Sequence, residues 1–154
     1  MAEPTVWTFF YGSFLNRDVL RQTGYVPERY EVAKLSGFDI SIQPLANLVR
    51  SDRHCVYGIV APATHEELRR LYSQGWVGTY LPVPVLVETV DGKWRAALCY
   101  IAPAPEAGPA GDDYIDRIVG PAREYGFPDW YVASLESFRP AGEVSPFGWS
   151  CRGP

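Results

Sequence analysis

The sequence predicts an α+β domain, in which strand patterns dominate the first half and helices are interspersed and late. Residues 6–11 form an apolar and aromatic run that is typical of a buried strand. Residues 30–62 carry further strand patterns, and helical periodicity returns after residue 112. The 154 residues match the size of one ordinary domain, which can bury a core without metals or disulfides.

The opening strand ends at a turn of small residues, Gly12-Ser13. Asn16 follows as the predicted N-cap of a short helix, and Gly24 is its predicted stop. Backbone N–H groups at the start of a helix have no intrahelical partner and can point at an anion. The order of strand, turn and helix therefore predicts a possible anion cradle at Gly12-Ser13.

The next segments predict three strands. Residues 31–35 alternate in part, residues 38–42 alternate strictly between apolar and polar side chains, and residues 55–60 are almost continuously apolar. Strict alternation indicates one buried face, and a continuous run indicates burial on both faces. Asn47 lies between these strands and is interpreted as a turn residue, with a place facing a pocket as the alternative.

A capping box at Thr64 and Glu67 predicts a helix over residues 65–74. A glycine-bracketed loop over residues 75–80 comes next. Asp91-Gly92 then separates two β-rich runs, residues 83–90 and 93–101. This dipeptide between such runs predicts a β-hairpin.

Residues 102–111 are rich in Pro, Ala and Gly, which predicts a surface linker or a lid. A helix capped by Asp112 or Asp113 should be kinked or split at Pro121. A last short helix should begin at Pro128-Asp129. The predicted organisation is one domain over residues 1–139, followed by a Pro/Gly-rich tail over residues 140–154.

The composition of the chain argues against several classes of binding partner. The formal net charge is −4 and the basic residues are scattered, which argues against a nucleic-acid partner. The apolar runs are shorter than a membrane span, so no membrane partner is expected. Three cysteines without a CxxC pair predict reduced thiols and a cytoplasmic location. His54 and His65 lack partners at metal-ligand spacing, so we expect no metal, and no cofactor is expected either.

Three segments resemble the gamma-glutamylcyclotransferase-like family, also described as AIG2-like or BtrG-like. They are residues 9–16 around Tyr-Gly-Ser, residues 56–71 with the capped helix, and residues 114–131. The segments come in family order and together span about nine-tenths of the chain. The resemblance implies a small mixed β-barrel-like sheet flanked by short helices, with a pocket where the first turn meets the central helix and the hairpin.

In family enzymes the first turn holds the alpha-carboxylate and amino group of a gamma-glutamyl unit. Carried onto this chain, the resemblance implies that the substrate-binding residues are Tyr11, Gly12, Ser13, Phe14, Leu15 and Tyr80. The implied partner is a small carboxylate-bearing molecule. An ordinary strand-to-helix turn at Gly12-Ser13, with Tyr80 serving only to pack, is the alternative.

The sequence departs from the family at the general base. Family cyclotransferases place a glutamate at the end of the central helix, and that position falls here on Gly75. A shift of one residue places Gln74 there, which is no better as a base. Glu88 is a weak replacement candidate, and a solvent-facing position on its strand is the alternative. The catalytic residue therefore stays unidentified.

Two functions follow from the resemblance and from this departure. The first is a gamma-glutamylcyclotransferase-like enzyme that acts on a small gamma-glutamyl or related amino-acid derivative. In that reaction the substrate's own amine attacks the gamma-carbonyl and 5-oxoproline is released. The alternative is a non-catalytic ligand-binding or regulatory domain that has lost the base. A scaffold function is suggested only by the aromatic tail, and the sequence does not set the oligomeric state.

Overall fold

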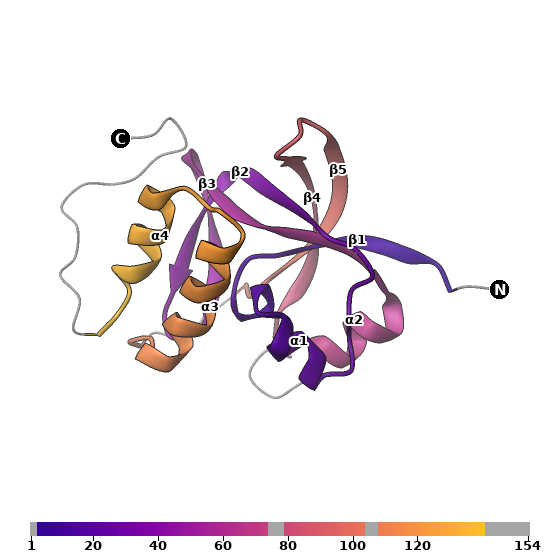
Figure 1. The fold of residues 1–154 in the computed structure, drawn as a ribbon, viewed down its shortest axis with the longest axis horizontal. Coiled ribbons are helices and arrows are strands. Elements are labelled where there is room, and N and C mark those ends of the chain that lie inside the picture. Colours follow the sequence, from indigo (N-terminus) through magenta and orange to yellow (C-terminus); the bar gives the residue numbers. More distant parts are fainter. Residues whose placement is uncertain (1–2, 74–78, 104–107, 141–154) are drawn as a thin grey trace.

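The computed structural model describes residues 3–73, 79–103 and 108–140 of the chain. In this part of the chain five strands close into a barrel in the order β1-β3-β2-β4-β5. Short helices flank the barrel, with α3 and α4 side by side at one end of it and α1 and α2 near the other (Figure 1). The elements are β1 (Thr5–Phe10), the 3-10 turn η1 (Ser13–Leu15), α1 (Arg17–Gln22), β2 (Glu31–Ile42), β3 (Ala46–Thr64), α2 (His65–Leu71), β4 (Leu81–Thr89), β5 (Trp94–Ile101), α3 (Asp112–Glu124) and α4 (Asp129–Glu136).

The sheet is mixed because β1 has a different relationship to each of its neighbours. It pairs antiparallel with β3 and parallel with β5, where Phe9 stands opposite Cys99. The remaining pairs are antiparallel. Phe9 and Phe10 are buried, as the aromatic run predicted. The predicted α+β class and the mixed, barrel-like sheet are confirmed.

The hairpin of β2 and β3 is longer than the sequence predicted. Residues 31–35 and 38–42 belong to one strand, interrupted only by a bulge between Ser36 and Phe38. Gly37 sits at the bulge with φ +91°, a conformation that other residues rarely adopt. The turn prediction for Asn47 is wrong, because this residue is buried inside β3 and bonds both backbone groups of Ala102.

A glycine allows β1 and β3 to approach closely. A Cβ on Gly58 would stand 2.3 Å from the carbonyl oxygen of Phe10 and 2.7 Å from the ring of Phe9. Both distances are far below van der Waals contact, so only glycine is compatible with this packing. The apolar run of the opening strand and the glycine in β3 therefore depend on each other.

The predicted caps at Asn16 and Thr64 and the predicted hairpin turn are confirmed. The Asn16 side chain accepts a hydrogen bond from the N–H of Asp18 at the start of α1. Thr64 and Glu67 form the reciprocal capping box of α2, although the helix ends at Leu71 rather than at residue 74. Gly92 turns the β4–β5 hairpin with φ +87°.

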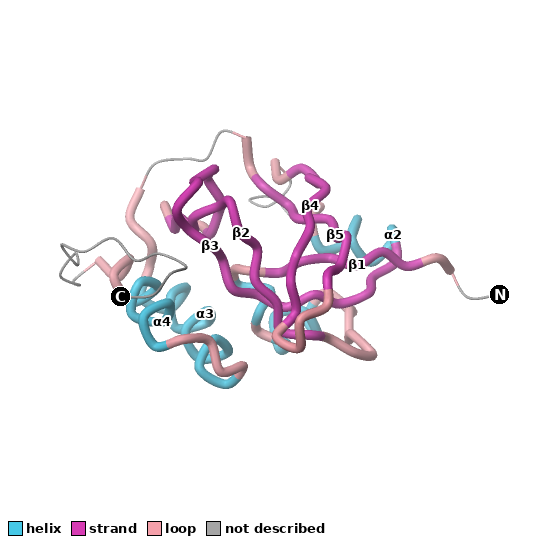
Figure 2. Tube along the Cα trace, turned by 90° about the horizontal axis from the view of Figure 1, so that it is seen from above, coloured by secondary structure: helices cyan, strands magenta, loops and turns pink. Residues whose placement is uncertain are grey.

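The helices α3 and α4 pack against each other beside the β2–β3 hairpin (Figure 2). The prediction that Pro121 splits the helix is wrong, because α3 runs continuously from residue 112 to residue 124. Pro121 removes one N–H donor, and the rest of the helix is anchored by a buried face that includes Ile115 and Ile118. The N-cap is Gly111 rather than either aspartate.

Among the described cysteines, the prediction of reduced thiols is wrong for Cys55. Cys55 is disulfide-bonded, whereas Cys99 is a free thiol buried in β5. Sequence spacing could not reveal this bond, because a disulfide depends on which side chains the fold brings together.

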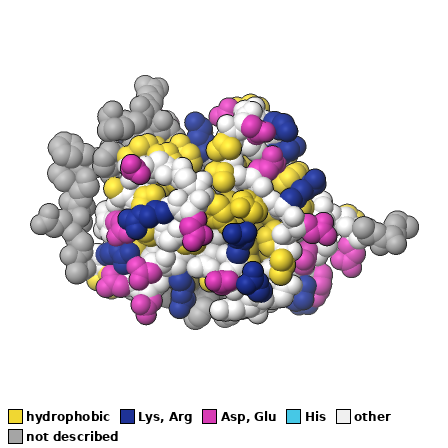
Figure 3. Space-filling view, viewed as in Figure 1, with side chains coloured by type: hydrophobic (Ala, Val, Ile, Leu, Met, Phe, Trp, Pro, Cys, Tyr) yellow, Lys and Arg dark blue, Asp and Glu magenta, His cyan; other side chains and the backbone are white. Residues whose placement is uncertain are grey.

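Charged side chains of both signs are interspersed with hydrophobic ones on the face shown in Figure 3. Within the described residues, no helix is both long and apolar enough to span a membrane. The predicted tail, from residue 141 on, lies outside the described residues, as does part of the predicted lid, residues 104–107.

Candidate active site

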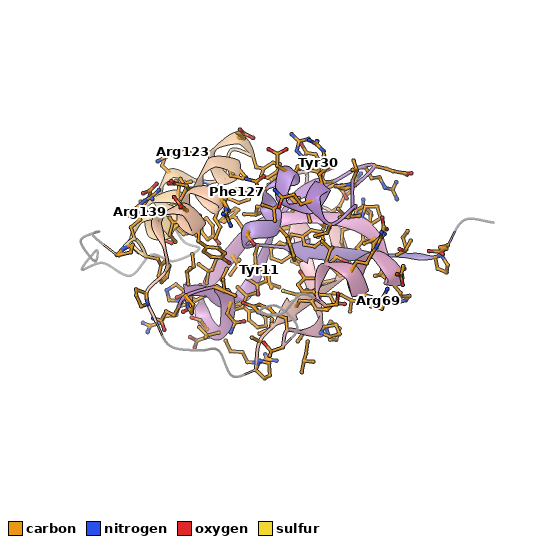
Figure 4. All side chains as sticks on the ribbon, turned by 90° about the horizontal axis from the view of Figure 1, so that it is seen from below. Tyr11, Tyr30, Arg69, Arg123, Phe127 and Arg139 are labelled. Atoms are coloured by element: carbon orange, nitrogen blue, oxygen red, sulfur yellow. The ribbon has the colours of Figure 1, made fainter. Side chains whose placement is uncertain are left out.

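A cavity of about 640 Å³ opens where the end of β1 meets η1. The segments around it come from both halves of the chain, and Tyr11 lies between the α3–α4 pair and α2 (Figure 4). Its described lining residues are Phe10, Tyr11, Gly12, Ser13, Phe14, Val19, Gln22, Thr23, Leu45, Ala46, Tyr72, Tyr80, Tyr100, Tyr114 and Arg117. The volume lies within the range of about 300–1,000 Å³ that is typical of small-molecule sites.

The floor of the cavity includes the turn that the sequence singled out. The first hydrogen bond of this turn runs from the N–H of Leu15 to the carbonyl of Gly12, at 3.0 Å. The N–H groups of Ser13 and Phe14 precede that bond and are therefore unpaired within the turn. Such groups are donors suited to a carboxylate.

Gly12 is required by a close approach and not by a positive φ. A Cβ at this position would stand 2.8 Å from the Cβ of Ala46 and 3.7 Å from the hydroxyl of Tyr114. Ala46 is held in place because its N–H donates a hydrogen bond to that hydroxyl, at 2.8 Å. The start of β3 thus rests directly on the turn, and a side chain on residue 12 would push the two apart.

Most of the predicted binding residues line this cavity. Tyr11, Gly12, Ser13 and Phe14 border it at the turn, and Tyr80 borders it from the position just before β4. The hydroxyl of Tyr80 donates a hydrogen bond to the carbonyl of Ala46, at 2.5 Å. Leu15 does not line the cavity: it is fully buried, and its carbonyl accepts a hydrogen bond from Tyr125 at 3.0 Å.

The sequence did not identify three further tyrosines of the wall, namely Tyr72, Tyr100 and Tyr114. Tyr72 and Tyr100 stack with their ring centroids 3.8 Å apart, and the hydroxyl of Tyr11 donates to the carbonyl of Tyr100 at 2.6 Å. For two of them, the only signal in the sequence was their place in the segments that resemble the family. Tyr72 stands where the family pattern has an acid, and Tyr114 lies in a resembling helix. Tyr100 carries no local signal.

The phenols of this wall are neutral hydrogen-bonding groups. Burial is the main cause that raises the pKa of Tyr11 and of Tyr72 well above the ordinary value for tyrosine. Burial likewise raises the pKa of Tyr114, and hydrogen bonds with the backbone of Ala46 and the side chain of Ser13, followed by nearby Arg117, partly oppose this effect. A phenol with a raised pKa donates and accepts hydrogen bonds but does not act as a base near neutral pH.

No aspartate or glutamate occurs among the described residues that line the cavity. Glu88 lies elsewhere on β4, half-exposed, with its carboxylate 4.0 Å from the amine of Lys34. Gln74 and Gly75, the positions that correspond to the family glutamate, lie outside the described residues. The one charged side chain of the described lining is Arg117, on α3.

Comparisons with known proteins identify the fold. No protein-family model matches the sequence, and no curated protein sequence matches it either. Among solved structures, a gamma-glutamyl cyclotransferase is 25% identical with a TM-score of 0.74, over 92% of this chain and 94% of that one. An uncharacterized protein from Homo sapiens is also 25% identical, with a TM-score of 0.71 over 95% and 92% of the two chains.

A gamma-glutamyl cyclotransferase from yeast, specific to glutathione, shares the fold with a TM-score of 0.60. It covers 90% of this chain and 98% of its own, at only 12% identity. The likeness to these structures extends over almost the whole barrel and its helices. By its structure, this chain has the gamma-glutamylcyclotransferase-like fold.

Proposed function

We propose that this chain binds a small gamma-glutamyl compound, or a related amino-acid derivative, in the cavity beside Ser13 and closes it to 5-oxoproline. The observation that carries the proposal is the turn after β1: the N–H groups of Ser13 and Phe14 have no partner within the turn, and both residues line a cavity of about 640 Å³. The structural likeness to a gamma-glutamyl cyclotransferase supports it. In this arrangement the N–H groups of Ser13 and Phe14 hold the alpha-carboxylate of the ligand.

The bonds that form and break all lie within the substrate, so the reaction needs no co-substrate. The alpha-amine attacks the gamma-carbonyl carbon, a new C–N bond closes the five-membered ring, and the C–N bond to the leaving amine breaks. The attacking amine must be neutral, since an ammonium has no electron pair to donate. The proton that it loses is balanced by the proton that the leaving amine gains.

The cavity wall supplies hydrogen-bond donors for the negative charge that develops on the gamma-carbonyl oxygen during the attack. The hydroxyl of Tyr114 is hydrogen-bonded by the N–H of Ala46 and by the side chain of Ser13. When it accepts from both, its own proton is directed to a ligand oxygen. Because its pKa is raised by burial, this phenol keeps its proton at neutral pH. Tyr114 is thus a hydrogen-bond donor to the carbonyl oxygen, and the base must come from elsewhere.

The test is to incubate the purified full-length chain with gamma-glutamyl amino acids and to measure 5-oxoproline by chromatography and mass spectrometry. We expect release of 5-oxoproline, with kcat/KM rising with pH until the alpha-amine of the substrate is deprotonated. A bell-shaped profile with an acidic limb near the pKa of a carboxylate would instead indicate a carboxylate base. No 5-oxoproline at any pH would refute the enzymatic function.

One observation favours a second function, a ligand-binding domain without turnover. The described lining contains no carboxylate, and its phenols are protonated near neutral pH. This function predicts heat in a calorimetric titration with gamma-glutamyl amino acids, together with unchanged ligand after prolonged incubation. Absence of heat with all of these ligands would exclude both functions.

A further inference from the structure

We propose that Arg117 determines specificity by binding a second carboxylate, on the part of the ligand that would leave as the amine. The preferred ligand class is then a gamma-glutamyl compound of an amino acid, whose leaving part ends in a free carboxylate, rather than of a neutral amine. This inference rests on the proposed function and concerns the same cavity.

The position of Arg117 on α3 directs it towards the cavity. It follows Tyr114 by three residues, and residues at this spacing share one face of a helix. Both side chains line the cavity, and the hydroxyl of Tyr114 reaches the vicinity of Gly12 in the first turn. Arg117 is exposed whereas Tyr114 is half-buried, so the arginine belongs to the more solvent-accessible part of the cavity lining.

The charge of Arg117 is uncompensated among the described residues. The neighbouring arginines Arg123 and Arg139 each form an ion pair with a described carboxylate, at 3.6 Å and 2.6 Å respectively. Figure 4 shows these two on the α3–α4 pair. No described aspartate or glutamate forms an ion pair with Arg117, and Asp113, one turn earlier on α3, is no exception. A carboxylate of the ligand would supply the negative charge that pairs with this guanidinium.

The separation between the first turn and the Arg117 side chain suits a ligand with two separated carboxylates. Three residues of helix correspond to a rise of about 4.5 Å, and the long arginine side chain adds to its reach. A gamma-glutamyl amino acid carries its alpha-carboxylate at one end and the leaving-group carboxylate at the other, several bonds away. With the first carboxylate on the N–H groups of Ser13 and Phe14, the second extends towards the open side of the cavity. A guanidinium matches a carboxylate with two parallel hydrogen bonds.

The experiment compares gamma-glutamylglycine with gamma-glutamylglycinamide, which differ only in whether the leaving part carries a carboxylate or an amide. Affinities are measured by calorimetric titration of the full-length chain. We expect the natural chain to bind gamma-glutamylglycine about tenfold more tightly, with a preference that falls as salt is added. Arg117→Gln should reduce this preference to about one, because gamma-glutamylglycine loses far more affinity than the amide does. Arg117→Lys should retain part of it, because it keeps the charge but loses the paired geometry.

Arg123→Gln is the matched control, since it removes the same charge from the same helix at a position that does not line the cavity. It should keep the full preference for gamma-glutamylglycine. If the natural chain binds both ligands equally, or if Arg117→Gln weakens both equally, the role of Arg117 is refuted while the proposed function stands. If the natural chain binds neither ligand, the proposed function fails, and this inference fails with it.

Discussion

Tyr72 and Tyr100 stack face to face, with ring centroids 3.8 Å apart and ring planes 7° from parallel. Tyr72 ends helix α2 and Tyr100 lies in strand β5, so the stack joins two segments that are remote in sequence. Phe14 of η1 meets Tyr72 edge-on at 5.3 Å. Through these two contacts Tyr72 connects the first turn, the central helix and the hairpin around the cavity.

Replacing Tyr72 should show how much this contact contributes. We expect Tyr72→Leu to lower the free energy of unfolding by about 1–3 kcal/mol, because it loses the stack with Tyr100 and the edge contact with Phe14. Tyr72→Phe keeps both rings in place and should cost less than about 1 kcal/mol. Urea denaturation followed by circular dichroism measures both. Equal stability of the two variants would mean that the stack contributes nothing.

Gly12→Ala should disturb both stability and binding. The added methyl would stand 2.8 Å from the Cβ of Ala46, so the start of β3 must move away from the turn. Overpacking of this kind costs about 1–3 kcal/mol. We expect that loss in urea denaturation, together with weaker binding of gamma-glutamylglycine.

Gly120→Ala is the control for this substitution. Gly120 lies in α3, and an added Cβ there would meet nothing within 4 Å. Alanine is a better helix former than glycine, so this variant should be stabilised by up to about 1 kcal/mol. A Gly12→Ala protein as stable as the natural chain would contradict the close approach.

Stability should fall at alkaline pH. Burial raises the pKa of Tyr11 and of Tyr72 in the folded chain, so the folded state keeps these phenol protons more tightly than the unfolded state does. The contribution is fully present below the unfolded pKa, about 10, and is lost as pH rises above it. Urea denaturation between pH 8 and pH 11 should show a declining free energy of unfolding above about pH 10.

Tyr72→Phe provides the comparison for the alkaline series, since it removes one of these phenols and retains the ring. Its decline above about pH 10 should be shallower than that of the natural chain. The same slope in both proteins would show that the Tyr72 phenol is not the source of the pH dependence.

Arg139 should stabilise the α3–α4 pair. Its guanidinium lies 2.6 Å from Asp116 on α3 and 2.5 Å from Glu136 on α4. We expect Arg139→Gln to lower the free energy of unfolding by about 1 kcal/mol, less in high salt. The hydrogen bond from Arg139 lowers the pKa of Glu136, so this contribution is present above the unfolded pKa of glutamate and is lost as pH falls.

Arg21→Gln serves as the comparison for Arg139, because Arg21 makes one exposed ion pair with Asp18 on its own helix. Its effect on unfolding should be clearly smaller. Thermal denaturation at low and high salt measures both variants. An equal effect of the two substitutions would argue against a role of Arg139 in joining the helices.

Local sequence predicted the elements whose signals are themselves local. The capping box of Thr64 and Glu67, the cap at Asn16 and the Asp91-Gly92 turn depend on residues within a few positions of one another, and each was confirmed. Pro121 does not split α3 as one form of the prediction had it, because the buried face of the helix outweighs one missing hydrogen bond.

The sequence by itself determined the class of the fold, the caps and turns, and the segment Tyr11-Gly12-Ser13-Phe14 that borders the cavity. Tertiary structure decided the rest of the wall. Tyr72, Tyr100 and Arg117 are brought to the first turn only when the barrel closes and α3 packs beside it. Which distant side chains meet is set by strand register and helix packing, and short-range patterns do not contain that information.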